Sequence, residues 1–91
     1  MTSRDAPASD DAAIERTLFE LLDARAATST ICPSEVARAL APDSEAAWRA
    51  MMPAVRRVAA SLARADRLAV LQRGVPVDAE TARGPIRLKR R

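Results

Sequence analysis

The residues of this sequence with a potential chemical function are its arginines, which can bind anions. The sequence pattern offers no pair of residues suited to catalysis. The 91 residues include 15 Lys and Arg, one Cys and no His. A His-dependent triad, a zinc site of His and Cys ligands and an internal disulfide all need residues that this composition does not supply. No nucleophile is paired with a base in the pattern, and the acidic residues fall on predicted solvent faces. We therefore predict a protein that is not an enzyme and that uses no metal or cofactor.

The charges are distributed unevenly along the chain. Residues 1–46 carry 4 Arg against 9 acidic residues, a net charge of −5, whereas residues 47–91 carry 11 Lys or Arg against 3 acidic residues, a net charge of +8. This polarity indicates an anionic partner for the C-terminal half, with nucleic acid favoured over a membrane surface. The alternative is a solvated basic face in an Ala- and Arg-rich chain.

Seven arginines are candidates for nucleic-acid binding. Four of them gather opposite the apolar face of a predicted helix, and three lie on a predicted hairpin. Two in the helix, at positions 56 and 57, are placed to read guanine edges if that helix begins at Pro53, and the others are expected to neutralise phosphates. The candidate residues are Arg49, Arg56, Arg57, Arg64, Arg73, Arg83 and Arg87.

The first elements that must position these arginines are a leader and a helix. Residues 1–10 are small and polar without periodicity, which predicts a disordered leader before a single domain over residues 11–91. Asp10 or Asp11 is expected to cap the helix that follows, which runs to about Arg25 with an acidic outer face. Phe19 lies off the centre of its apolar stripe, where it either widens the apolar face or marks a contact.

Two further helices follow. Pro33 is suited to the first turn of a short helix that ends at Leu40. Cys32 stands in its N-cap position three residues before Glu35, as either a structural capping residue or a reactive thiol. The third helix begins after Asp43 or Ser44 and runs to about residue 65, and Pro53 is expected either to kink it or to split it.

The C-terminal part of the sequence has the two-residue hydrophobic period that is typical of β-strands. Apolar residues alternate over residues 68–71 and 86–89, which predicts a hairpin, and the short stretch 28–32 before the second helix predicts a brief extended segment. Gly74 and Gly84, the only glycines, bracket the long turn and are expected to hold positive φ angles. Eight side chains at the centres of the apolar faces are predicted to be buried together: Leu18, Leu22, Val36, Leu40, Val55, Leu62, Val70 and Ile86.

This order of elements predicts a mainly α fold with a small β-hairpin, an α+β winged helix-turn-helix of three helices and a two- or three-stranded wing sheet. The stretches TICPSEVARAL, WRAMMPAVRRVAASLA and RGVPVDAETARGPIRL resemble a small bacterial family described only as a domain of unknown function, of winged-helix type. The resemblance covers residues 14–89. It implies a winged-helix fold and a bacterial cytoplasmic origin, and it transfers no catalytic residue.

The function predicted from these residues is binding of duplex DNA, as in a transcriptional regulator. The alternative is a protein-interaction module or a homodimer, for which Phe19 or an exposed Trp48 would be the contact. With one Trp, one Phe and no Tyr, stacking of single-stranded bases is disfavoured. No run approaches the ~20 apolar residues that span a bilayer, and no signal peptide is evident, so we expect no membrane partner and a cytoplasmic location.

Overall fold

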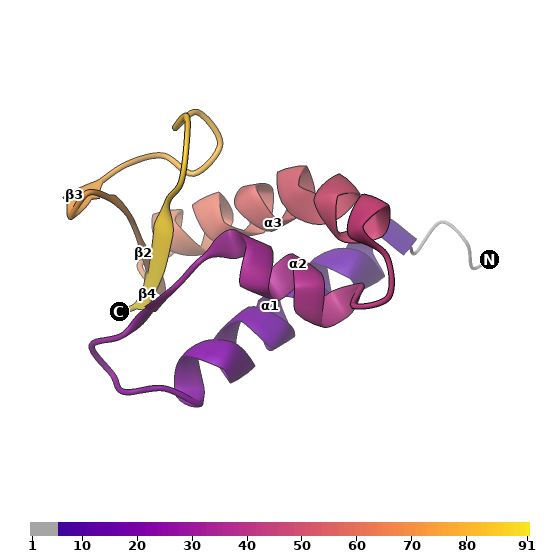
Figure 1. Cartoon of the computed structure of the whole chain (residues 1–91). Coiled ribbons are helices and arrows are strands. Elements are labelled where there is room, and N and C mark those ends of the chain that lie inside the picture. The colour runs from indigo at the N-terminus through magenta and orange to yellow at the C-terminus, as the bar shows by residue number, and fades with distance from the viewer. Residues whose placement is uncertain (1–5) are drawn as a thin grey trace.

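Three helices pack against one another, and a small sheet lies at the end where the first and third helices finish (Figure 1). The computed structural model describes residues 6–91, with side chains from residue 11 onward. The helices are α1 (Ala6–Asp23), α2 (Pro33–Leu40) and α3 (Glu45–Arg64). None of the helices in this range is long and apolar enough to cross a membrane.

Helix α1 begins earlier than the sequence pattern predicts. It starts at Ala6 and not at the expected cap of Asp10 or Asp11. Pro7 is its second residue, where the missing N–H costs nothing because the first four N–H groups of a helix have no partner inside it. Residues 6–10, which the sequence pattern assigns to the leader, belong to this helix, and residues 1–5 lie outside the described part of the chain.

Capping residues start the other two helices as predicted. Cys32 is the N-cap of α2, and its backbone N–H donates to Oε2 of Glu35 at 2.9 Å. Ser44 caps α3, and its hydroxyl accepts the N–H of Ala47 at 3.1 Å. Pro53 lies inside α3 as one continuous helix, so the predicted split does not occur. Because Pro53 is exposed, water can reach the helix backbone on this face, which makes the lost hydrogen bond tolerable.

The sheet has four antiparallel strands in the order β1-β4-β2-β3, one more than the largest sheet predicted. The strands are β1 (Thr30–Ile31), β2 (Leu68–Gln72), β3 (Val75–Pro76) and β4 (Arg87–Arg90). Strand β3 exists because Gln72 pairs with Val75 across a two-residue turn. Both turn residues have positive φ, 53° at Arg73 and 81° at Gly74, as tight hairpin turns require. The fold is thus α+β and winged-helix-like.

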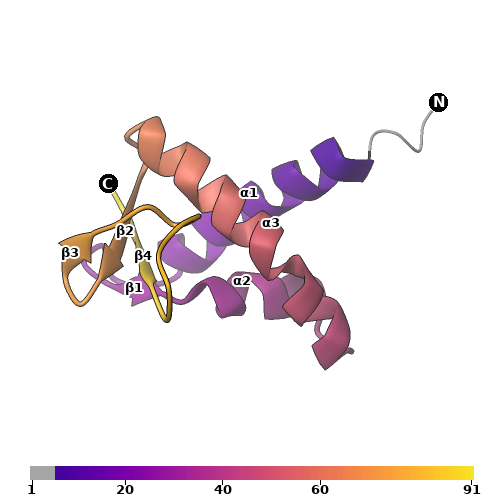
Figure 2. The same cartoon turned by 90° about the horizontal axis from the view of Figure 1, so that it is seen from above.

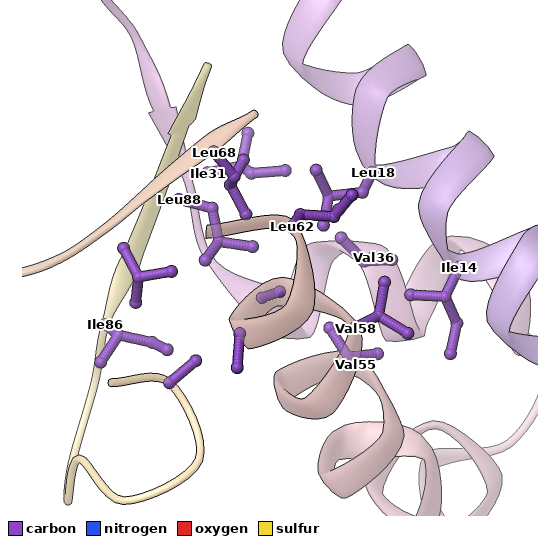
Figure 3. Close-up of a cluster of buried hydrophobic side chains, with 14 of the residues drawn as sticks. Ile14, Leu18, Ile31, Val36, Val55, Val58, Leu62, Leu68, Ile86 and Leu88 are labelled. Carbon is purple, nitrogen blue, oxygen red and sulfur yellow. The ribbon is translucent and has the colours of Figure 1, made fainter. Parts of the chain in front are cut away.

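The core lies between the helices and the inner face of the sheet (Figure 3). Seven of the eight side chains predicted to be buried are buried, and Ile14, Ile31, Leu68 and Leu88 join them. Leu40 is the exception, because it is the last residue of α2 and is only half-buried at the edge of the cluster. The period of the sequence marks Leu40 as inward-facing but does not reveal that the helix ends there.

Gly74→Val is expected to loosen the hairpin while the three helices remain formed. Both glycines have the predicted positive φ, and no atom lies within 4 Å of a Cβ built at Gly74. The cost is therefore backbone strain and not a clash, about 1 to 2 kcal/mol or more for a β-branched residue. Far-UV circular dichroism should keep its helical signal while hydrogen exchange speeds up in β2 and β3. Gly74→Asn, which tolerates positive φ, should change much less, and equal effects of the two variants would contradict this explanation.

Candidate nucleic-acid interface

The acidic face of α1 is paired with arginines from the C-terminal half of the chain. Three ion pairs join them: Asp11 with Arg57 at 2.5 Å, Glu15 with Arg67 at 2.8 Å, and Asp23 with Arg90 at 3.1 Å. The strong charge asymmetry of the sequence is therefore partly compensated within the fold. Arg90, in the basic stretch that ends the sequence, is among the compensated residues.

Arg56 and Arg57 turn to opposite sides of α3, although they are neighbours in the sequence. Arg57 points to α1 and meets Asp11. The Arg56 guanidinium points to the loop between β3 and β4 and donates to three of its carbonyl oxygens, those of Ala79 at 3.2 Å, Ala82 at 2.9 Å and Gly84 at 2.8 Å. The planar fork of Arg56 is thus engaged within the fold, which does not favour the expectation that Arg56 reads base edges.

The β3–β4 loop lies against α3 and does not project as a free wing (Figure 2). Ala79 in this loop is fully buried. A shallow cavity of about 250 Å³ between loop and helix is lined by Ala60 and Ala63 on α3 and by Val77 on the loop. The small side chains of α3 at these positions allow the close approach. The loop thus borders the exposed stripe of α3 on one side, and α1 borders it on the other.

Arg49 and Arg64 remain on this exposed stripe of α3. Arg49 pairs with Glu45 at 2.7 Å and Arg64 pairs with Glu80 at 3.8 Å, and both arginine side chains are about 65% exposed. Ion pairs this exposed contribute roughly 0 to 1 kcal/mol. A phosphate group can therefore take the place of either carboxylate at little cost.

Arg73 and Arg83 are presented on the side of the hairpin. Both are exposed, and neither side chain makes an ion pair or hydrogen bond to any residue from 11 to 91. Gln72 holds the backbone beneath Arg83, since its Nε2 donates to the carbonyls of Arg83 at 2.5 Å and Pro85 at 3.2 Å. These two cations are supported by a well-bonded backbone and are available to an anion.

Arg87 belongs to a different surface. It lies on the face of β4 opposite buried Leu88, and its guanidinium donates to the hydroxyl of Thr30 at 2.8 Å and to the carbonyl of Thr30 at 3.0 Å. It fastens β1 to β4. The seven predicted residues therefore lie on different surfaces. Arg49, Arg64, Arg73 and Arg83 are exposed on α3 and the hairpin, whereas the half-buried Arg56 and the exposed Arg57 and Arg87 are bonded to other parts of the fold.

Four arginine–aromatic contacts, two at each of two rings, were not foreseen from the sequence. The guanidinium carbons of Arg67 and Arg90 lie 4.9 and 4.6 Å from the centre of the Phe19 ring. Those of Arg38 and Arg49 lie 4.6 and 5.0 Å from the Trp48 ring. Phe19 therefore both widens the apolar face of α1 and makes a contact. Arg38 could be recognised in the sequence only as an outward-facing residue, because its partner comes from another helix.

Glu35 joins the start of α2 to the segment after α1. Its Oε1 accepts Nη2 of Arg25 at 2.5 Å, and its Oε2 accepts the Cys32 N–H. Partial burial alone would raise the pKa of Glu35, but the bond from Cys32, the bond and charge of Arg25 and the charge of Arg87 outweigh it and lower the pKa. The Cys32 thiol accepts a hydrogen bond from the Ser34 hydroxyl at 3.2 Å, which fits the structural interpretation of this residue.

Acidification should remove the stabilisation that Glu35 provides. Because its pKa is lower in the folded than in the unfolded state, the contribution is full above the unfolded pKa, about 4.3, and is lost as the pH falls through the folded value. Glu35→Gln should melt below the parent at pH 7 and match it in acid, below both pKa values. Glu20→Gln, on the exposed face of α1, should show no such convergence. A constant gap between Glu35→Gln and the parent at all pH values would contradict the assignment.

The model of the family described as "Protein of unknown function (DUF3253)" matches residues 11–91. No curated protein matches the chain. In the described part of the chain, no group of three or more His, Cys, Asp or Glu is placed to hold a metal ion.

Proposed function

The chain belongs to the DUF3253 family, whose description gives no activity, and from its surface we propose that it is a winged-helix protein that binds duplex DNA. The observation that carries this proposal is the pair Arg73 and Arg83, two exposed cations on a hydrogen-bonded hairpin and loop beside the exposed arginines of α3. In helix-turn-helix proteins the second helix of the motif, which corresponds to α3 in this chain, enters the major groove. A bacterial cytoplasmic location, which the family resemblance implies, fits this function.

Four arginines are available for phosphates in this proposal: Arg49, Arg64, Arg73 and Arg83. Each phosphate contact displaces condensed counterions, so four contacts give a slope of log affinity against log salt of about −4. The acids that remain exposed on α1, such as Glu20, repel DNA from that side. The docking face is therefore the side of α3 that carries the hairpin.

The test is binding of the full chain to a labelled mixed-sequence duplex across a salt series. The wild-type protein should bind at low salt, and its log affinity should fall with log salt at a slope of about −4. Replacing both Arg73 and Arg83 by Gln should make the slope less steep by roughly 2, whereas Arg16→Gln, an exposed charge change on α1, should leave it nearly unchanged. Absence of duplex binding at low salt would overturn the proposal.

The alternative of a protein-interaction module has one observation in its favour. Val75, at the tip of the β2–β3 hairpin, is 59% exposed. It is the large apolar residue that is exposed to solvent in the described part of the chain. The contacts expected from the sequence do not support it, since Phe19 and Trp48 are partly buried against the core with arginines over their rings. Light scattering decides the point, because a stable dimer dissociated by Val75→Ser would favour this alternative.

A further inference from the structure

One cationic surface extends beyond the arginines predicted from the sequence, because it joins Arg49, which belongs to that set, to Arg38, which does not. It consists of Arg38 near the end of α2, Trp48 and Arg49 in the first turns of α3, and we refer to it as the Trp48 cluster. Trp48 is partly buried and packs against the core, so the ring is fixed. The guanidinium carbons of Arg38 and Arg49 lie 4.6 and 5.0 Å from its centre. Two arginines from different helices are thus held beside one rigid ring.

Stacking on the ring leaves both guanidinium groups able to bind an anion. A guanidinium that lies over an aromatic ring contacts the ring through the flat face of the guanidinium. Its N–H groups then point outward in the guanidinium plane, where they can donate to an anion. Arg38 is exposed and has no acidic partner within residues 11–91. Arg49 has only the exposed pair with Glu45. Because the ring restricts both side chains beforehand, less conformational entropy is lost when they contact a phosphate.

The position of the cluster fits a second contact on the same duplex. Helix α3 has 20 residues, which corresponds to a length of about 30 Å. The Trp48 cluster lies at its N-terminal end, and the hairpin with Arg73 lies beyond its other end (Figure 1). One helical turn of B-DNA measures about 34 Å, and in helix-turn-helix proteins the helix before the recognition helix crosses the DNA backbone.

We propose that Arg38 and Arg49, held on Trp48, bind the phosphate backbone of duplex DNA at the α2–α3 end of the molecule. This inference rests on the proposed function and adds a site to it. The hairpin contacts the duplex at one end of α3, and the Trp48 cluster contacts a phosphate about one helical turn away.

The cluster contains its own spectroscopic probe. Trp48 is the only tryptophan, and the chain has no tyrosine, so its fluorescence reports on this surface alone. Titration with a 20-base-pair duplex should change the intensity or the emission maximum of Trp48 in parallel with the anisotropy of a labelled duplex. Binding by anisotropy without a change at Trp48 would overturn the inference while the proposed function stands.

Charge variants supply the second measurement. Arg38→Gln should make the salt slope less steep by about 0.9 and weaken binding roughly tenfold at 0.1 M salt. Arg16→Gln removes the same charge from an exposed position on α1 and should have little effect. Equal effects of the two variants would overturn the inference.

The same titration separates the other outcomes. If no duplex binds to the wild-type protein at low salt, the proposed function fails, and this site fails with it. If poly-glutamate changes Trp48 fluorescence at the same charge concentration as the duplex does, the cluster is a surface for acidic proteins and the assignment to DNA is overturned.

Discussion

Replacing Leu62 by alanine is expected to lower the free energy of unfolding by about 2 to 5 kcal/mol, a large share of the stability of a domain of this size. Leu62 is 5% exposed and belongs to the same cluster as Leu18 and Leu68 (Figure 3). It therefore contributes to the contact between α3, α1 and the sheet. The loss combines the transfer free energy of the removed carbons with the cost of the cavity that remains. Urea denaturation followed by circular dichroism measures it.

Leu40→Ala is the matched control for this experiment. The same atoms are removed, but Leu40 is only half-buried at the end of α2. Partial burial predicts a loss below about 1.5 kcal/mol. A Leu62→Ala protein that unfolds like its parent, or a Leu40→Ala protein that loses as much, would show that the buried face of α3 is assigned wrongly.

The helices and the core follow from short-range patterns in the sequence. Apolar residues at a spacing of three and four place Leu18, Leu22, Val55 and Leu62 inside, since only one face of each helix can be covered. The end of each helix is harder to predict. Ala6 and Pro7 carry no apolar period, yet α1 includes them, because alanine favours helix and proline is compatible with a first turn.

The candidate site was less predictable than the fold, because it depends on pairs of residues far apart in the sequence. A helical wheel places Arg56 and Arg57 on the exposed side of α3. It does not show that a loop from residues 77–84 and the acids of α1 lie on either side of that stripe. Arg56 meets Gly84 across 28 positions and Arg57 meets Asp11 across 46. The net charge of a segment likewise cannot reveal which of its charges are paired after folding.

Arg56→Ala is expected to release the β3–β4 loop from α3. The three carbonyls that Arg56 binds lie in the segment from Ala79 to Gly84. A hydrogen bond to a charged group contributes about 1.5 to 3 kcal/mol, but water can replace it where the carbonyl is exposed, so the total loss should be about 1 to 3 kcal/mol. The amide groups of Thr81 and Ala82, which bond to the carbonyl of Asp78 within the loop, should exchange faster with solvent.

Arg57→Ala is the control that isolates this role, because it removes the same side chain from the next position of the same helix. Arg57 makes an ion pair with Asp11 in which both side chains are nearly half exposed, so its loss should cost roughly 0 to 1 kcal/mol and leave exchange in the loop unchanged. Arg56→Lys should behave more like Arg56→Ala, since an ammonium group keeps the charge but cannot reach three carbonyls with a planar fork. If Arg56→Ala instead weakened duplex binding with no change in loop exchange or stability, Arg56 would contact DNA directly, and its assignment as the anchor of the loop would be wrong.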